Sequence, residues 1–219
     1  MISAKLPVIP AILTDNPEEF ARQLAFAKSI AGAVHLDIID GQFATGLALE
    51  VEKWPVLGRG YAEAHLMVES PIDYLTALKS KKVTRAIVHL ESRFDLHQLV
   101  VKARELDLLI GWAVNLDTDL STLYPYLTQS TYIQVMGVKP GASGQPQDHQ
   151  AELAVRFLRS LTRFRLTISV DGGVNGENIG PLVAYGADYL IAASAIFAQF
   201  DWPKAYEGLL LVARKKVAQ

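Results

Sequence analysis

Eight short apolar runs recur along the chain, and their spacing constrains the fold more than any other feature. They begin at intervals of roughly 22 to 35 residues, with amphipathic stretches between them, as a repeated strand and helix unit requires. The runs are Val8–Leu13, Ala33–Asp40, Tyr61–Val68, Arg85–Glu91, Leu109–Asn115, Tyr132–Val138, Thr167–Gly173 and Tyr189–Ser194. Most stay apolar up to a polar residue at the C-terminal end, which is typical of parallel strands buried on both faces. The pattern predicts an α/β fold, a single (β/α)8 TIM barrel that takes up residues 1–219 as one domain.

The stretches between the runs carry helix signals. Asn16 is typical of an N-cap and Pro17 of a first helical position, and four apolar residues then predict one buried stripe. The stripe residues are Phe20, Leu24, Ala27 and Ala31. Gly186 is expected to close the helix that starts near Asn175, in the left-handed conformation that glycine tolerates.

A second buried stripe is expected in the helix after the sixth run. Its members are Leu153, Ala154, Phe157, Leu158 and Leu161. Three arginines fall mostly outside this stripe, and the sequence places them on a solvated face. They are Arg156, Arg159 and Arg163.

An open doubly wound sheet is the alternative fold, because it also alternates strands and helices. The first turn lacks the GxGxxG fingerprint of such sheets. Polar residues also end runs along the whole chain rather than at one switch point, which favours a barrel whose strand ends share one mouth.

Composition narrows the classes of partner. A chain of 219 residues that is 50% hydrophobic can bury a large core, and its formal net charge of -2 leaves no basic excess for nucleic acid. No apolar run has the length of about 20 residues that a membrane span needs. Lys5, Pro7 and Pro10 interrupt the start of the chain before any signal-like core forms, so a cytoplasmic protein without a membrane partner is expected.

Four polar side chains at strand ends are candidate metal ligands. His35 and Asp37 alternate with Leu36 inside the second run, so both point to the same side, while His65 and Asp171 end the third and seventh runs. The chain has no cysteine, so any metal must be held by histidine and carboxylate. Each residue alone could be a hydrogen-bonded core residue, but a shared divalent ion would satisfy all four together.

The other three histidines carry weaker signals. His89 ends the fourth run and could either line the pocket or make a structural hydrogen bond. His97 and His149 lie in polar stretches where helices begin, and both are expected at the surface.

Five segments, in their order along the chain, resemble the signatures of ribulose-phosphate 3-epimerases. The segments are His35–Gly41, His65–Val68, Pro140–Gln145, Val170–Asn175 and Ala193–Phe197. Asn115, after the fifth run, also fits. The resemblance runs from about Pro7 to Phe197, and five ordered motifs are far more specific than one glycine pattern.

The resemblance implies roles for named residues. His35, Asp37, His65 and Asp171 match the metal ligands, and Asp37 and Asp171 also match the two acid/base groups. Backbone amides of three loops match the phosphate site, and His65 is counted with the substrate-binding residues. The loop residues are Gly141, Ala142, Ser143, Gly144, Gly172, Gly173, Ala193 and Ser194. Small residues suit that task because an amide approaches an anion closely when no Cβ intervenes.

The resemblance also implies a cofactor, a substrate and an assembly. One divalent metal ion is expected, zinc first, with iron, manganese and cobalt as alternatives. The expected reaction is the 3-epimerisation of D-ribulose 5-phosphate to D-xylulose 5-phosphate, with two carboxylates moving the proton through an enediolate. We expect the runs that carry Asp37 and Asp171 to lie on either side of the first run. The relatives form oligomers, so a homo-oligomer is expected.

Departures from the family pattern cluster around the expected substrate and leave two other functions open. They comprise Ala11 for a serine, Ile39 for a methionine, Ala142 and Ser143 for Phe and Gly, Ala193 for a glycine, Lys139 for an acid, and Phe43–Gly46 for a Phe-Val-Pro-Asn segment. The alternatives are the same reaction on a hexulose phosphate such as allulose 6-phosphate, and a non-catalytic sugar-phosphate-binding barrel. A binding barrel would not need the four metal ligands.

Overall fold

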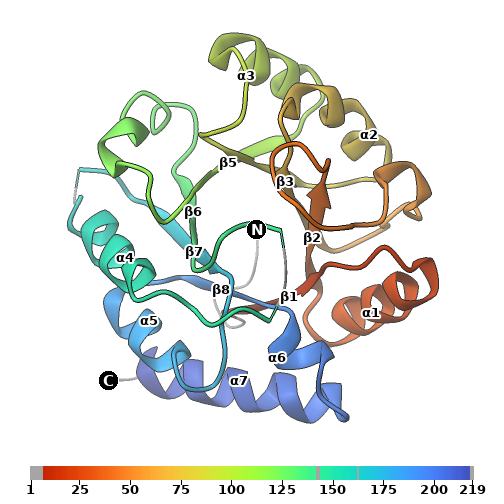
Figure 1. Cartoon of the computed structure of the whole chain (residues 1–219), viewed down its shortest axis with the longest axis vertical. Helices are drawn as coiled ribbons and strands as arrows, with labels where there is room; N and C mark the ends of the chain where they lie inside the picture. The colour runs from red at the N-terminus through yellow and green to blue at the C-terminus, as the bar shows by residue number, and fades with distance from the viewer. Residues whose placement is uncertain (1–6, 142–143, 162, 218–219) are drawn as a thin grey trace.

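Eight parallel strands close into a barrel, as the apolar runs predict (Figure 1). The structure is a computed structural model and describes residues 7–141, 144–161 and 163–217. The strands are β1 Val8–Ile12, β2 Ala33–Ile39, β3 Tyr61–Met67, β4 Arg85–His89, β5 Leu109–Val114, β6 Tyr132–Met136, β7 Thr167–Asp171 and β8 Tyr189–Ala192. β1 pairs with both β2 and β8, which closes the ring. The assignment of residues 1–219 to one domain stays a prediction.

Helices surround the barrel and cover its outer face (Figure 1). The α-helices are α1 Pro17–Ile30, α2 Leu75–Ser80, α3 Leu96–Glu105, α4 Gln150–Ser160, α5 Ile179–Tyr185, α6 Ser194–Phe197 and α7 Trp202–Val217. The short 3-10 helices are η1 Val51–Lys53, η2 Pro71–Tyr74 and η3 Leu120–Leu123. Among the described residues, the connections after β2 and β5 contain only a 3-10 helix, so the barrel departs there from a strict strand and helix repeat.

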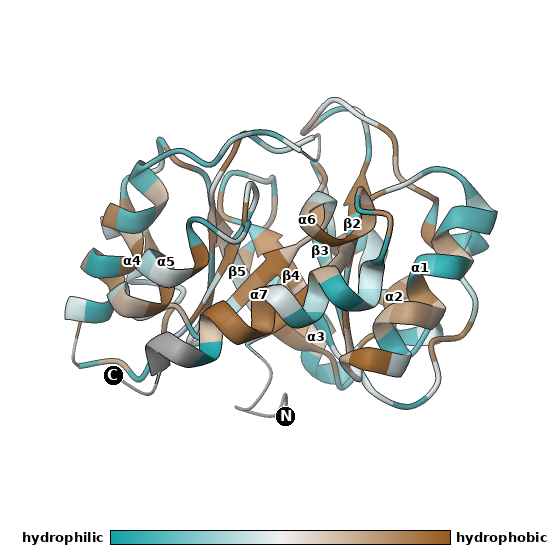
Figure 2. Cartoon of the chain, turned by 90° about the horizontal axis from the view of Figure 1, so that it is seen from below, coloured by the Kyte–Doolittle hydropathy of each residue, from teal (hydrophilic) through white to brown (hydrophobic). Residues whose placement is uncertain are grey.

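Side chains alternate between two environments along each strand. Outward-facing residues such as Leu36, Leu66 and Ile133 are 0% exposed and pack in the large core between strands and helices. Figure 2 shows the same division, with apolar residues concentrated on the strands and polar residues on the outer helix faces and the loops above the barrel. The barrel interior is smaller and partly polar, with small apolar clusters around Ile9 and Ile191 and around Ile87 and Ala113.

The sequence signals for α1 are confirmed. The side chain of Asn16 accepts hydrogen bonds from the backbone N–H groups of Glu18 and Glu19, which satisfies two donors that a helix start leaves free. All four residues of the predicted stripe are buried. Gly186 ends α5 with φ of 108°, as its position predicts.

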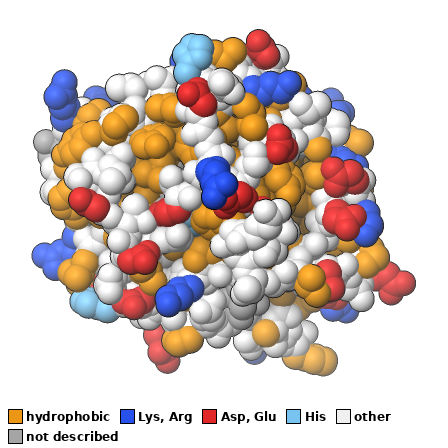
Figure 3. Space-filling model, turned by 45° about the horizontal axis from the view of Figure 1, so that its top comes forward, with side chains coloured by type: hydrophobic (Ala, Val, Ile, Leu, Met, Phe, Trp, Pro, Cys, Tyr) orange, Lys and Arg blue, Asp and Glu red, His pale blue; other side chains and the backbone are white. Residues whose placement is uncertain are grey.

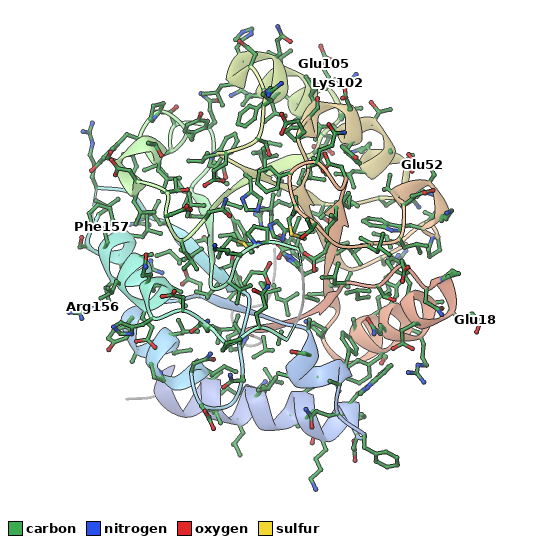
Figure 4. The ribbon with its side chains drawn as sticks, viewed as in Figure 1. Glu18, Glu52, Lys102, Glu105, Arg156 and Phe157 are labelled. Carbon is green, nitrogen blue, oxygen red and sulfur yellow. The ribbon has the colours of Figure 1, made fainter. Side chains whose placement is uncertain are left out.

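The predicted buried stripe of α4 is wrong in two of its residues. Leu153 is 50% exposed and Phe157 is 42% exposed, and Figure 4 shows Phe157 pointing away from the barrel. The docked face is instead formed by Ala151, Val155 and Leu158, because their spacing of i, i+4 and i+7 places them on one side of the helix, away from Leu153 and Phe157.

Arg159 on α4 is likewise not a solvated side chain. It donates hydrogen bonds to the carbonyl oxygens of Leu166 and Gly186 and forms an ion pair with Asp188 at 2.7 Å. It therefore links α4 to the loops that precede β7 and β8. Arg156, by contrast, points outward (Figure 4).

Charged side chains of both signs occur on the surface (Figure 3). On the face drawn in Figure 3, acidic and basic side chains are interspersed and no large basic patch forms. Within the part of the chain that the structure describes, no helix is long and apolar enough to cross a bilayer.

Candidate metal centre and active site

The four predicted metal ligands meet at the mouth of the barrel. His35 and Asp37 come from β2, His65 from β3 and Asp171 from the end of β7, and each offers a ligand atom within 4.8 Å of the others. The strand register sets part of this contact, because Asp37 is the direct neighbour of His65 across β2 and β3. His65 Nδ1 lies 3.0 Å from Asp37 Oδ1 and 3.1 Å from Asp171 Oδ2.

The arrangement of β2 and β7 differs from the prediction. β8 and β2 flank β1, and β7 is one strand further around the barrel. Asp37 and Asp171 still converge, because inward side chains at the strand ends of an eight-stranded barrel reach one mouth. The expectation that β2 and β7 directly flank β1 is therefore wrong, because β8 lies between β1 and β7, while the convergence of the two aspartates is confirmed.

The site has the donor set and the free nitrogen that a divalent cation needs. His35 Nε2 is buried and makes no hydrogen bond of good geometry with any described residue, although it lies 3.4 Å from both Asp37 Oδ1 and Asp171 Oδ2. Buried polar atoms are rarely left without a partner. Two imidazole nitrogens and two carboxylates suit zinc or a similar ion, so the residues fit the metal that the sequence implies.

Charges in the cluster are balanced by shared protons when no cation is bound. Burial opposes charge on His35, but contacts with Asp171, Asp37 and Glu63 outweigh it and raise the pKa of His35 well above its usual range. The pKa of His65 is raised in the same way by Asp171 and Asp37. Partial burial would raise the pKa of Asp171, but its contacts with His35 and His65 outweigh this and lower it. A divalent cation would replace these imidazole protons.

These shifts predict how the stability of the metal-free protein depends on pH. The raised pKa values of His35 and His65 contribute stability that is fully present below about pH 6.5 and is lost as the pH rises through their folded values. We expect chemical denaturation to show the metal-free protein losing stability as the pH rises above about 6.5. Protein loaded with a divalent cation should not show this loss, because metal-bound imidazole carries no such proton. Stability that rises over the same window without metal would contradict the charge balance.

His89 makes a structural hydrogen bond, which decides between the two roles left open for it. The side chain is 0% exposed, its Nε2 lies 2.8 Å from His65 Nε2, and its Nδ1 lies 3.0 Å from Glu91 Oε2. Burial lowers the pKa of His89 to about 4, so the ring is neutral near pH 7. His97 and His149 are exposed, as predicted.

A pocket joins the metal cluster to the predicted phosphate loops. Asp37, His65 and Asp171 line it. The described residues of the three loops line it as well, namely Gly141, Gly144, Gly172, Gly173, Ala193 and Ser194. Ala142 and Ser143, which were predicted to join them, lie outside the described residues. One small pocket therefore holds both parts of the expected site, and Lys139 also lines it.

The sequence pattern did not single out several residues that surround the predicted ligands. Glu63 and Gln134 are 0% exposed, and each bonds to a predicted ligand: Glu63 to His35 at 2.9 Å, and Gln134 to Asp171 at 3.0 Å. Met67 and Met136 line the pocket. A signal existed for Glu63, because it lies two residues before His65 on the same strand and therefore faces the same side. Gln134 likewise precedes Met136 by two residues on β6.

The loops after β2 and β6 touch through backbone at two glycines, which the sequence did not reveal. A Cβ on Gly46, whose φ is 132°, would lie 2.2 Å from the carbonyl oxygen of Gly141. A Cβ on Gly141, whose φ is 121°, would lie 2.1 Å from the carbonyl oxygen of Thr45. The Phe43–Gly46 segment thus fixes where the β6 loop crosses the mouth.

Gly46→Ala is expected to displace the β6 loop and to raise the KM for substrate. Gly41→Ala is the matched control, because Gly41 also has a positive φ of 75° but no atom within 4 Å of its added Cβ. Backbone strain should cost both variants about 1–2 kcal/mol in the free energy of unfolding, and the clash should cost Gly46→Ala more. Urea denaturation and steady-state kinetics measure both effects. Equal KM values in the two variants would contradict the role of the contact.

Comparisons with known proteins agree with this geometry. A model of the ribulose-phosphate 3 epimerase family matches residues 7–197. The chain is 30% identical over 178 residues to a ribulose-phosphate 3-epimerase of Aquifex aeolicus, covering 78% of this chain and 80% of the relative. It is 27% identical over 208 residues to the ribulose-phosphate 3-epimerase of Bacillus subtilis, covering 91% and 96%.

Solved structures with much lower identity share the fold alone. A mutant tryptophan synthase α-subunit from Pyrococcus furiosus superposes with a TM-score of 0.72 at 15% identity, covering 100% of both chains. A thiamine phosphate pyrophosphorylase from the same organism gives a TM-score of 0.64 at 16% identity, covering 98% of both chains.

Proposed function

Because the chain belongs to the ribulose-phosphate 3 epimerase family of isomerases, we propose that it is a metal-dependent 3-epimerase that interconverts D-ribulose 5-phosphate and D-xylulose 5-phosphate. The observation that carries the proposal is the cluster of His35, Asp37, His65 and Asp171, three of which line one pocket together with small residues of three loops. A binding barrel without catalysis would have no use for this buried donor set.

Asp37 and Asp171 are the proposed acid/base pair. Inverting a carbon next to a carbonyl requires a proton to leave one face of the substrate and another to return to the opposite face, so two groups are the simplest solution. Both side chains border the pocket, and they come from strands on different sides of the mouth. One carboxyl group must hold a proton before the reaction, and the direction of the reaction decides which.

The four clustered residues would hold the metal, with zinc expected first and iron, manganese and cobalt as alternatives. A bound divalent cation supplies Lewis-acid stabilisation of the negative charge that develops on the substrate as its C3 proton leaves. His35 and His65 would each contribute a neutral imidazole nitrogen to the metal. Asp37 and Asp171 would bind the metal as well and would also move the protons.

The phosphate is proposed to bind the backbone amides of the loops after β6, β7 and β8. Gly172 and Gly173 support this, because their φ values of 103° and 68° hold the loop in a conformation that other residues rarely adopt. Ala193 and Ser194 border the same pocket. Lys139, which also lines it, adds a positive charge suited to an anion.

Epimerisation assays on a panel of ketose phosphates test this function. Protein reconstituted with zinc, iron, manganese or cobalt is offered pentulose and hexulose phosphates and the matching unphosphorylated sugars. We expect the highest kcat/KM on D-ribulose 5-phosphate and little turnover without the phosphate. A preference for allulose 6-phosphate would replace D-ribulose 5-phosphate as the proposed substrate. Inactivity on the whole panel would overturn the proposed epimerase activity. The homo-oligomer also stays a proposal, which light scattering on the same samples would measure.

A further inference from the structure

We propose that Glu63 is a positioning residue that fixes the tautomer and the orientation of His35 for metal binding. This inference rests on the proposed metal-dependent function and extends it to a residue outside the pocket. Glu63 lies on β3, is 0% exposed, and is not among the residues that line the pocket beside the metal cluster. Its carboxylate is directed to the side of His35 that faces away from that cluster.

The contact between Glu63 and His35 decides which imidazole nitrogen is free. Glu63 Oε1 lies 2.9 Å from His35 Nδ1, and the two residues are direct register partners on β2 and β3. An ionised carboxylate only accepts hydrogen bonds, so Nδ1 must carry the hydrogen. The lone pair of the neutral ring is then on Nε2, the atom that lies 3.4 Å from both Asp37 and Asp171.

Glu63 is itself held in place by residues at the bottom of the barrel interior. Its Oε2 accepts hydrogen bonds from Tyr61 Oη at 2.6 Å and from Tyr132 Oη at 3.0 Å. Arg85 Nη1 lies 3.8 Å from the same oxygen, and the Arg85 guanidinium stacks 3.8 Å from the centroid of the Tyr132 ring. The His35 imidazole, at 2.9 Å, is nearer to the Glu63 carboxylate than the Arg85 guanidinium is, at 3.8 Å. An ion pair with Arg85 alone therefore does not account for the position of Glu63.

The second imidazole of the cluster has a comparable support. His65 Nε2 faces His89 Nε2, and His89 Nδ1 faces the carboxylate of Glu91 at 3.0 Å. Glu91 is held in turn by the backbone N–H of Asn115. Each imidazole therefore has one nitrogen that faces the cluster and a second nitrogen that is supported by a carboxylate. The support of His35 is direct, from Glu63, and the support of His65 passes through the His89 ring to Glu91. Such outer partners orient metal-binding imidazoles and raise their basicity.

Metal affinity of the Glu63→Gln variant tests the inference. The substitution keeps the size of the side chain and removes its charge, and the new amide could also turn a donor toward His35. We expect Zn²⁺ affinity, measured by competition with a chromophoric chelator, to fall about 10- to 100-fold, and the visible spectrum of the Co²⁺-loaded protein to change. Tyr132→Phe is the matched control, since it removes the Tyr132 hydroxyl, which lies 3.0 Å from Glu63 Oε2 and 3.3 Å from Glu63 Oε1, and keeps the carboxylate that faces His35. Its Zn²⁺ affinity should stay within about threefold of the wild type.

A folding defect is separated from a positioning effect by a second variant. Glu63→Gln leaves the buried charge of Arg85 without its carboxylate, so Glu63→Gln is also made together with Arg85→Met. The double variant should show the same loss of Zn²⁺ affinity. Wild-type affinity and an unchanged Co²⁺ spectrum in either folded variant would overturn the positioning role alone. Failure of the wild-type protein to bind any of Zn²⁺, Fe²⁺, Mn²⁺ and Co²⁺ would overturn the proposed metal-dependent function, and this inference with it.

Discussion

Asp171→Asn and Asp37→Asn should each lower epimerase turnover by about 100-fold or more, the scale of general acid–base catalysis. An amide cannot take the C3 proton or return one, so each variant loses one of the two transfers that inversion requires. Steady-state kcat on the preferred ketose phosphate measures the effect. Asp117→Asn, an exposed aspartate after β5, is the control and should keep wild-type turnover.

Metal content must be measured in the same samples, because both aspartates belong to the proposed metal site. A loss of turnover in protein that still holds one metal ion isolates the proton transfer. Any metal that leaves adds a further loss. Near-normal turnover of metal-loaded Asp171→Asn would show that the two-carboxylate assignment is wrong.

Removing the metal is expected to lower turnover by at least about 100-fold, because stabilising the charge of an enediolate is worth several kcal/mol. Dialysis against a chelator followed by addition of Zn²⁺, Fe²⁺, Mn²⁺ or Co²⁺ should restore activity. His35→Ala should resist restoration, because it removes one ligand of the cluster. Full activity in protein shown by elemental analysis to be metal-free would argue for catalysis by the side chains alone.

The strand pattern was predictable because parallel strands in a barrel are buried on both faces. Each of the eight observed strands begins at the residue where its apolar run begins. The runs extend one or two residues too far at the C-terminal end, as from Met136 to Val138, because the chain leaves the ladder there to form the loops of the mouth. The side of the strand on which His35 and Asp37 lie was also predictable, because side chains two residues apart on a strand point the same way.

What the sequence left undetermined depends on contacts between distant segments. The face that α4 buries depends on how the helix docks, and residues as small as Ala151 occupy it while Phe157 is exposed. The partnership of Glu63 with His35 follows from the register of β2 and β3, which a single strand does not encode. The contact between Gly46 and Gly141 joins loops that are far apart in the sequence, and only their backbones meet.

Deuterium incorporation during turnover tests the central claim most directly. Zinc-loaded wild-type protein is incubated with D-ribulose 5-phosphate in deuterated water, and the product is analysed by NMR and mass spectrometry. The two-carboxylate account predicts D-xylulose 5-phosphate with one deuterium at C3, because the proton that returns comes from a group that exchanges with solvent. Epimerised product with protium retained at C3, or no epimerisation at all, would contradict it.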